Sequence, residues 1–177
     1  MKPLKLYKRR RWKLQTECQS LWFFTCARPG RTADPRTKFA PIPDDTVHRW
    51  VLGLPGPATA IVSLLGWKPD GTSEFSFYSF CGGFELASDS RRLSFGNWLD
   101  KHHGDLAIAV CEHPTWDFKA IPAGDLDAIS TDIRRLAAAG RTVVLIDSGG
   151  ETRTGQVCKH MNAVPDSSTA SPISRSI

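Results

Sequence analysis

Residues 146–155 carry the residue types of a phosphate-binding loop, in the order Ile-Asp-Ser-Gly-Gly-Glu-Thr-Arg-Thr-Gly. A buried strand that opens through glycines onto a helix N-terminus gathers unpaired N–H groups and the positive end of the helix dipole in one concavity. Such a concavity binds anions, phosphate especially. Glycines let the backbone wrap an oxyanion closely, and an arginine can donate two hydrogen bonds to phosphate oxygens. The candidate phosphate-binding residues are Ser148, Gly149, Gly150, Glu151, Thr152 and Arg153.

This loop resembles the signature of the protein tyrosine phosphatase and dual-specificity phosphatase superfamily, His-Cys-x-x-Gly-x-x-Arg-Ser/Thr-Gly. The match covers Gly150, Arg153, Thr154 and Gly155. At the two leading positions the sequence departs from the signature, because residue 146 is isoleucine in place of histidine and Asp147 stands in place of the cysteine nucleophile.

The resemblance also implies a general acid upstream of the loop. The family protonates its leaving group with an aspartate on a mobile loop, often written Trp-Pro-Asp, and Asp117 follows Trp116 at 30 residues before Asp147. By this resemblance Asp117 is the general acid and Arg153 is the phosphate clamp. Thr154 supplies the hydroxyl that stabilises the departing thiolate in active members.

The missing cysteine determines the expected function. Phosphatases of this kind attack phosphorus with a thiolate, and an aspartate is a far poorer nucleophile. Asp147 is also an anion on the floor of an anion site, so we expect it to pair with Arg153 and the loop amides and to compete with phosphate. Two like charges about 4 Å apart cost roughly 4 kcal/mol at an effective dielectric near 20. The sequence therefore predicts a pseudophosphatase that binds a phosphorylated or protein partner.

Two other functions and one structural role stay open. The chain can be a phosphoester hydrolase that uses Asp147 as an unusual nucleophile or as a base for water. It can be an anion-binding or nucleotide-binding module of another α/β fold, although neither G-x-G-x-x-G nor a Walker A loop is present. An acid followed by glycines also occurs as a simple helix cap. We assign no metal and no cofactor, because His102, His103 and His160 lack carboxylate or cysteine partners at ligand spacing.

The elements around the loop predict an α/β fold with a central, mostly parallel sheet flanked by helices. Apolar residues recur at helical spacing over 125–139, and Gly140 is a natural end for that helix. The β-branched run 142–146 is typical of a central parallel strand. A helix is expected over 153–161. Upstream, strands are expected over 48–54, 60–65, 74–80 and 106–111, and a short helix over 94–102.

Charge and composition predict loose ends around one domain that spans residues 45–164. Of the net charge of +5, seven positive charges lie in the first 13 residues, which leaves −2 for the rest of the chain. Residues 1–44 are expected to form a basic, poorly ordered arm and linker. Its basic cluster over 8–11 is interpreted either as a solvated segment or as a contact for nucleic acid or another acidic partner. Residues 165–177 are expected to be a disordered tail.

Composition also predicts the compartment. No apolar run is long enough to cross a bilayer, and the basic N-terminus is unsuited to secretion, so we expect a cytoplasmic protein without a membrane partner. The five cysteines include no C-x-x-C pair and are expected to be reduced. Cys158 lies five residues past Arg153 and is expected to belong to the core rather than to replace the nucleophile.

Overall fold

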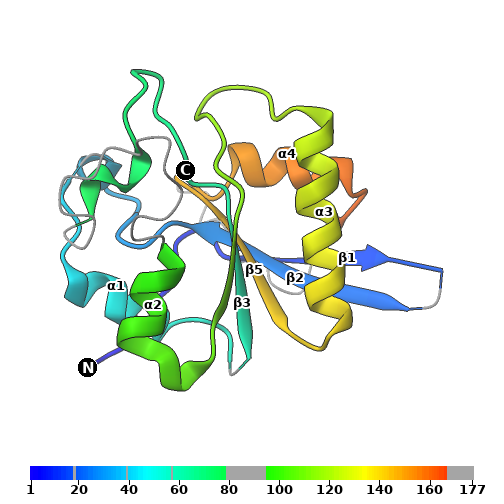
Figure 1. Ribbon diagram of the computed structural model, residues 1–177, viewed down its shortest axis with the longest axis horizontal. Coiled ribbons are helices and arrows are strands. Elements are labelled where there is room, and N and C mark those ends of the chain that lie inside the picture. Colours follow the sequence, from blue (N-terminus) through cyan, green and yellow to red (C-terminus); the bar gives the residue numbers. More distant parts are fainter. Residues whose placement is uncertain (18, 39, 57, 79–94, 167–177) are drawn as a thin grey trace, which may run out of the picture.

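The computed structural model describes residues 1–17, 19–38, 40–56, 58–78 and 95–166, and its centre is one mixed sheet (Figure 1). The strand order is β4-β3-β5-β2-β1-β6. Strands β4, β3, β5 and β2 run parallel, β1 is antiparallel to β2, and β6 is antiparallel to β1. The strands are β1 (Arg10–Gln15), β2 (Ser20–Ala27), β3 (Thr59–Ser63), β4 (Ala109–Glu112), β5 (Thr142–Asp147) and β6 (Val164–Pro165). The predicted α/β class with a mostly parallel sheet is confirmed.

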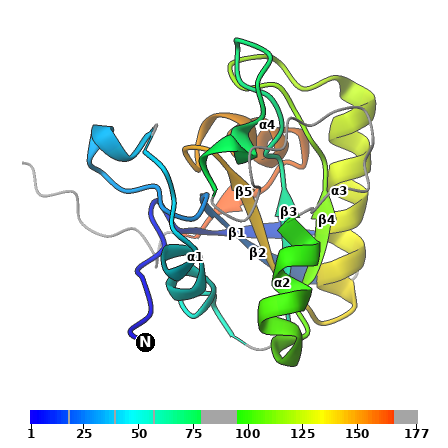
Figure 2. The same cartoon turned by 60° about the vertical axis from the view of Figure 1, so that its left-hand side comes forward.

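Four α-helices in the described part of the chain cover the two faces of this sheet (Figure 1, Figure 2). They are α1 (Asp44–Val51), α2 (Phe95–His103), α3 (Ala123–Ala138) and α4 (Thr152–His160). Successive side chains of β5 point to opposite faces, as the pleat requires. Val144 and Ile146 pack in the cluster that contains the buried residues of α1 and α2, whereas Val143 and Leu145 pack with α3 and α4.

The C-terminal unit that carries the candidate loop is folded as predicted. In α3 the buried residues Ile129, Ile133 and Leu136 recur at helical spacing, and the chain turns at Gly140, which has a φ of +77°. Strand β5 is buried along almost its whole length, as expected of a central strand between two neighbours. The helix expected over 153–161 is α4, which begins one residue earlier.

The N-terminal residues are ordered differently from the prediction. Residues 1–44 were expected to be a poorly ordered arm and linker, but β1 and β2 form a hairpin inside this range, and β2 pairs with β5 in the middle of the sheet. Phe23 and Cys26 are buried in the two clusters on opposite faces. The prediction of a disordered arm is therefore wrong for 10–15 and 20–27, because apolar side chains of β2 complete the core.

Two predicted strands are helical instead. Residues 48–54 were expected to be a strand, but α1 occupies 44–51 and buries Val47, Trp50 and Val51 at i, i+3 and i+4. Residues 74–80 were also expected to be a strand, but Glu74–Phe77 form a 3-10 helix, with Ser73 as its N-cap. Residues 79 and 80 lie outside the described residues.

The remaining elements agree with the prediction more closely. Strand β3 covers most of 60–65, and α2 covers most of 94–102, whose first residue is not among those described. The strand expected over 106–111 is shorter and starts later, because Gly104–Leu106 form a 3-10 turn. At the edge of the sheet, β4 is only half-buried. The predicted tail 165–177 lies outside the described residues from 167 onward, and Cys18 and Cys81 also lie outside them. In the part of the chain that is described, no helix has the length and apolar character needed to cross a membrane.

Candidate functional site

Asp147 is the last residue of β5 and its carboxylate points into the loop that follows. One oxygen, Oδ1, accepts a hydrogen bond from the backbone N–H of Gly150, and Oδ2 accepts one from the N–H of Thr154 at 2.9 Å. Thr154 belongs to the first turn of α4, whose N–H groups lack intrahelical acceptors. Asp147 is 2% exposed. The carboxylate therefore occupies the place that the loop amides would offer to an anion.

Gly150 fixes the path of the loop around this carboxylate. Its φ is +76°, and a Cβ atom at this position would lie 2.5 Å from the backbone nitrogen of Ala27 on β2. A side chain is therefore excluded both by the left-handed backbone and by the neighbouring strand. The second glycine, Gly149, has open space where its Cβ would be. Of the two glycines that the sequence singled out, Gly150 is the one that the loop requires.

Arg153 does not pair with Asp147, contrary to our expectation, and binds Glu74 instead. Its Nη1 lies 2.7 Å from Oε2 of Glu74, and its Nη2 lies 2.8 Å from Oε1, which is a bidentate pair. Arg153 is 1% exposed and Glu74 is 2% exposed. Nη1 also donates to the carbonyl oxygen of Leu64 at 3.0 Å. Glu74 is anchored in turn, because its Oε2 accepts from the N–H of Gly66 at 2.8 Å.

The charge of Arg153 is thus balanced inside the protein. Burial lowers the pKa of its guanidinium, but the hydrogen bonds and the negative charge of Glu74, followed by the charges of Asp147 and Asp117, outweigh burial and raise the pKa above its ordinary value. The arginine stays positive at any physiological pH. Its Nε is buried and has no hydrogen-bond partner among the residues that the structure describes.

Asp117 lies beside the loop, as the resemblance implied. One of its carboxylate oxygens is 3.5 Å from Nη2 of Arg153. The segment that holds it is pinned to the chain after β3, since the N–H of Asp117 donates to the carbonyl oxygen of Trp67 at 2.8 Å and the N–H of Trp67 donates to Thr115 at 3.1 Å. The rings of Trp67 and Trp116 stack with centroids 5.8 Å apart. The tertiary structure therefore brings together an acid and an arginine that the sequence separates by 36 positions.

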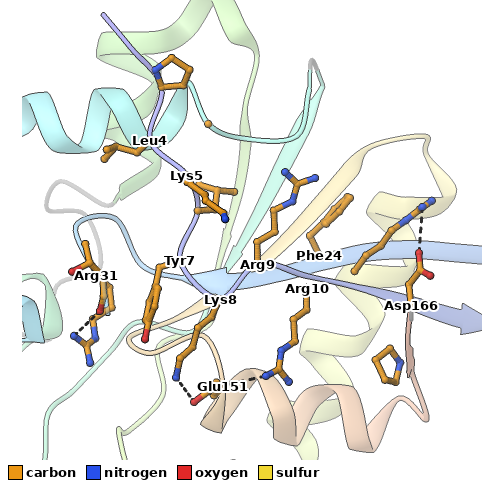
Figure 3. A pocket seen from close by; sticks show the side chains of 16 residues that line it. Leu4, Lys5, Tyr7, Lys8, Arg9, Arg10, Phe24, Arg31, Glu151 and Asp166 are labelled. Carbon is orange, nitrogen blue, oxygen red and sulfur yellow. Dashed lines mark hydrogen bonds and ion pairs between the residues drawn. The ribbon is translucent and has the colours of Figure 1, made fainter. Parts of the chain in front are cut away.

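The other candidate residues divide between the site and the outer surface. Thr154 is buried, and Ser148 lines a cavity above the loop. Glu151 points away from this cavity, because its carboxylate pairs with Lys8 and, at 3.7 Å, with Arg10 on the N-terminal segment (Figure 3). Thr152 is exposed.

The cavity above the loop has a volume of about 330 Å³ and carries both signs of charge. It is lined by Lys38, Lys68, Pro69, Asp70, Glu74, Asp117, Phe118 and Ser148. Two lysines and three carboxylates therefore line this cavity together with Ser148. No group of three or more His, Cys, Asp or Glu side chains suited to a metal ion occurs among the described residues.

Cys158 lies in α4 within the core on the α3 and α4 side of the sheet. Burial, more than any charge, raises the pKa of its thiol to about 12, so the thiol is uncharged at neutral pH. A neutral, buried thiol is neither a nucleophile nor a metal ligand. Our expectation that Cys158 belongs to the core agrees with this position.

Glu74 is the site residue that sequence reasoning missed. It lies 79 positions from Arg153, in a segment whose alternating aromatic residues predicted a strand. The available signal was indirect: an arginine at the start of a helix that follows a buried strand is buried itself, and a buried charge needs a partner. Which acid supplies that partner depends on the tertiary fold.

Comparisons of this chain with protein-family models, with curated proteins and with solved structures find no match.

Proposed function

We propose that this chain is a phosphatase-like domain without phosphatase turnover, which acts by binding a phosphorylated or protein partner. The observation that carries the proposal is the carboxylate of Asp147 inside the loop, where it accepts hydrogen bonds from the N–H groups of Gly150 and Thr154. In an anion-binding loop these donors serve the ligand. Here these N–H groups donate to the side chain of Asp147 instead.

The neutralised arginine supports the same proposal. Both terminal nitrogens of Arg153 are bound to Glu74, so an incoming phosphate would have to displace a buried carboxylate that is also held by a backbone N–H. Such a phosphate would also lie close to the negative charge of Asp147. At about 4 Å and an effective dielectric near 20, that repulsion alone costs roughly 4 kcal/mol. Tight binding of phosphate at the loop floor is therefore disfavoured.

The alternative hydrolase mechanism has less support. A carboxylate nucleophile needs an oxygen that can approach phosphorus, but both oxygens of Asp147 accept hydrogen bonds from the backbone and the side chain is 2% exposed. A base for water likewise needs an oxygen that a water molecule can reach, and the same burial and hydrogen bonds oppose this. Asp117 alone, without a nucleophile, does not make a catalyst.

The cavity above the loop is the place that we assign to a partner. Lys38 and Lys68, which are partly exposed, line it together with Ser148. A phosphoryl group or an acidic side chain presented by another protein can reach these lysines without displacing Glu74 or Asp147. In this arrangement a phosphoryl group would bind at the lysines that line the cavity and not at the N–H groups of the loop.

The wild-type chain is expected not to hydrolyse aryl phosphates or phosphotyrosine peptides above background, because no thiolate stands at the end of β5. Steady-state release of phosphate, measured with Arg153→Ala and Cys158→Ser as controls, tests this. Turnover that disappears in Arg153→Ala and survives in Cys158→Ser would contradict the proposal and favour the mechanism that uses Asp147.

Asp147→Ser is expected to bind sulfate or phosphate more tightly than the wild type, because it removes the competing anion and releases the N–H groups of Gly150 and Thr154. Isothermal titration calorimetry on both proteins measures the difference. Asp100→Ser, which changes the net charge equally at an exposed position of α2, is the matched control and should leave the affinity unchanged. Equal affinity of Asp147→Ser and wild type would show that the loop amides do not form an anion site.

A further inference from the structure

The N-terminal segment lines a second and larger hollow, an open groove of about 1170 Å³ that lies along residues 3–11. Figure 3 shows this groove, with the basic side chains of the segment arranged along it. We call it the basic groove. Its basic lining residues are Lys5, Lys8, Arg9, Arg10, Arg11 and Arg31, and its acidic ones are Glu151 and Asp166.

The positive charge of the basic groove is only partly balanced. Lys8 and Arg10 both pair with Glu151, and Arg11 lies 3.5 Å from Asp166. Within the part of the chain that the structure describes, Lys5 and Arg9 make no ion pair. The groove therefore carries an excess of cations that a polyanion can neutralise, with release of its counterions.

Aromatic rings alternate with these cations. The guanidinium of Arg9 lies 4.8 Å from the centre of the Phe24 ring, and that of Arg11 lies 4.0 Å from the ring of Trp22, which is not one of the residues that line the groove. Tyr7 lies between Lys8, at 5.4 Å from its ring, and Arg31, at 5.9 Å. Phe24 and Tyr7 themselves line the groove and are half-buried, so part of each ring is accessible.

The spacing of these pairs repeats along the hairpin. Arg9 and Arg11 are two residues apart, with Arg11 in β1 and Arg9 just before it, and Trp22 and Phe24 are two residues apart on the antiparallel strand β2. Residues two apart in a strand lie on one face and about 7 Å apart. The hairpin thus places a cation beside an aromatic ring at two successive steps, of which the Arg9 and Phe24 step lines the groove. Together with Tyr7 and its two cations, this step fits a linear polymer that carries one negative charge and one flat group per unit.

We propose that the basic groove binds single-stranded nucleic acid. The cations would hold the phosphates and the rings would stack with bases, the combination by which single strands are bound without sequence preference. An acidic peptide would use the cations but has no need of the rings. A membrane surface is flat, whereas these side chains line a concave groove. The proposal is independent of the phosphatase-like loop, which the groove meets only through the outward-facing Glu151.

The test is fluorescence anisotropy of labelled oligonucleotides of about 12 nucleotides, a length within the range covered by single-strand binding folds. We expect saturable binding that weakens as salt rises from about 50 to about 200 mM, with a slope near −0.7 per phosphate contact. Lys5→Glu/Arg9→Glu should weaken binding by about tenfold or more. The control Lys101→Glu/Arg134→Glu makes the same change of net charge at exposed positions of α2 and α3, and should retain most of the affinity.

The aromatic contribution separates a nucleic acid from other polyanions. Tyr7→Ala should weaken oligonucleotide binding by about fivefold or more, whereas Tyr7→Phe, which keeps the ring, should bind like the wild type. Poly-glutamate and anionic phosphatidylserine vesicles serve as competitors and should displace the oligonucleotide poorly. Equal losses in the groove variant and its control would overturn the proposal. So would tighter binding of a duplex, stronger competition by poly-glutamate or vesicles, or an affinity unaffected by Tyr7→Ala.

Discussion

Asp147→Cys is expected to acquire a reactive thiol and measurable phosphatase activity. The introduced sulfur would lie at the end of β5 and face the N–H groups of Gly150 and Thr154, which now serve the carboxylate. Hydrogen bonds to the anionic form and the dipole of α4 both stabilise a thiolate, so its pKa should fall well below the usual value of about 8.5. The rate of alkylation by iodoacetamide as a function of pH, followed at this position by mass spectrometry, measures that pKa.

Turnover by this variant depends on two neighbouring carboxylates. Asp117 lies 3.5 Å from Arg153, where it can protonate a leaving group, so Asp147→Cys/Asp117→Asn should lose activity toward poor leaving groups by about 10²–10⁴-fold. Glu74 acts in the opposite direction, because it occupies the arginine that would bind the phosphoryl oxygens. Asp147→Cys/Glu74→Gln should therefore have a lower KM than Asp147→Cys alone.

Cys158 is an internal control for the alkylation experiment. Cys158 is buried and uncharged at neutral pH, so its alkylation in the folded protein should be slow in every variant. If the introduced thiol reacts no faster than an ordinary cysteine, the loop is not an anion cradle and the resemblance to phosphatases is accidental. A fast-reacting thiol without turnover would support an anion-binding loop but would show that Asp117 does not act as the general acid.

The parts of the fold that could be predicted are those in which local signals agree. In 125–161 the spacing of Ile129, Ile133 and Leu136, the turn at Gly140 and the β-branched run that follows all specify the same helix, strand, loop and helix. The candidate loop therefore lies where it was expected, between the end of β5 and the start of α4. Asp117 was located only through the resemblance, because nothing local to 113–118 indicates a contact with Arg153.

The errors arise where a tertiary contact decides the local structure. Strand β1 has only two apolar residues, Trp12 and Leu14, among three charged ones, which is too short an alternation to predict a strand. It is held by pairing with β2 and by side chains such as Arg11 that lie over aromatic rings. Helix α1 has only two turns, so its few apolar residues fit a strand as well as a helix. The two acids that follow Pro43, at the positive end of the helix dipole, were the signal that favoured a helix.

The role of Glu74 in the site could not be predicted from sequence for the same reason, because it depends on a tertiary contact. Both the prediction that Asp147 would pair with Arg153 and the identification of the arginine as a free phosphate clamp assumed that no other acid would reach it. A buried guanidinium with two terminal nitrogens is best satisfied by one carboxylate in a bidentate pair. Sequence shows that such a partner is needed, but the fold selects Glu74.

Arg153→Ala is expected to lower the free energy of unfolding by about 3–5 kcal/mol, because it leaves a buried carboxylate without its partner. Glu74 is 2% exposed, and of its contacts only the N–H of Gly66 would remain as a donor. Urea denaturation, with the m-value checked for constancy, measures the loss. Arg134→Ala, an exposed arginine of α3, is the matched control and should change stability by less than about 0.5 kcal/mol.

A second variant distinguishes a broken ion pair from a simple loss of packing. Arg153→Met/Glu74→Gln removes both charges and keeps side chains of similar length, so it should be more stable than Arg153→Ala although it carries more substitutions. The coupling between the two positions follows from a double-mutant cycle with the single variants Arg153→Met and Glu74→Gln. Additive losses in that cycle, or a loss below about 1 kcal/mol in Arg153→Ala, would show that the pair does not stabilise the fold as a buried unit. The arginine would then be free to serve a ligand, which would restore the phosphate clamp that the resemblance implies.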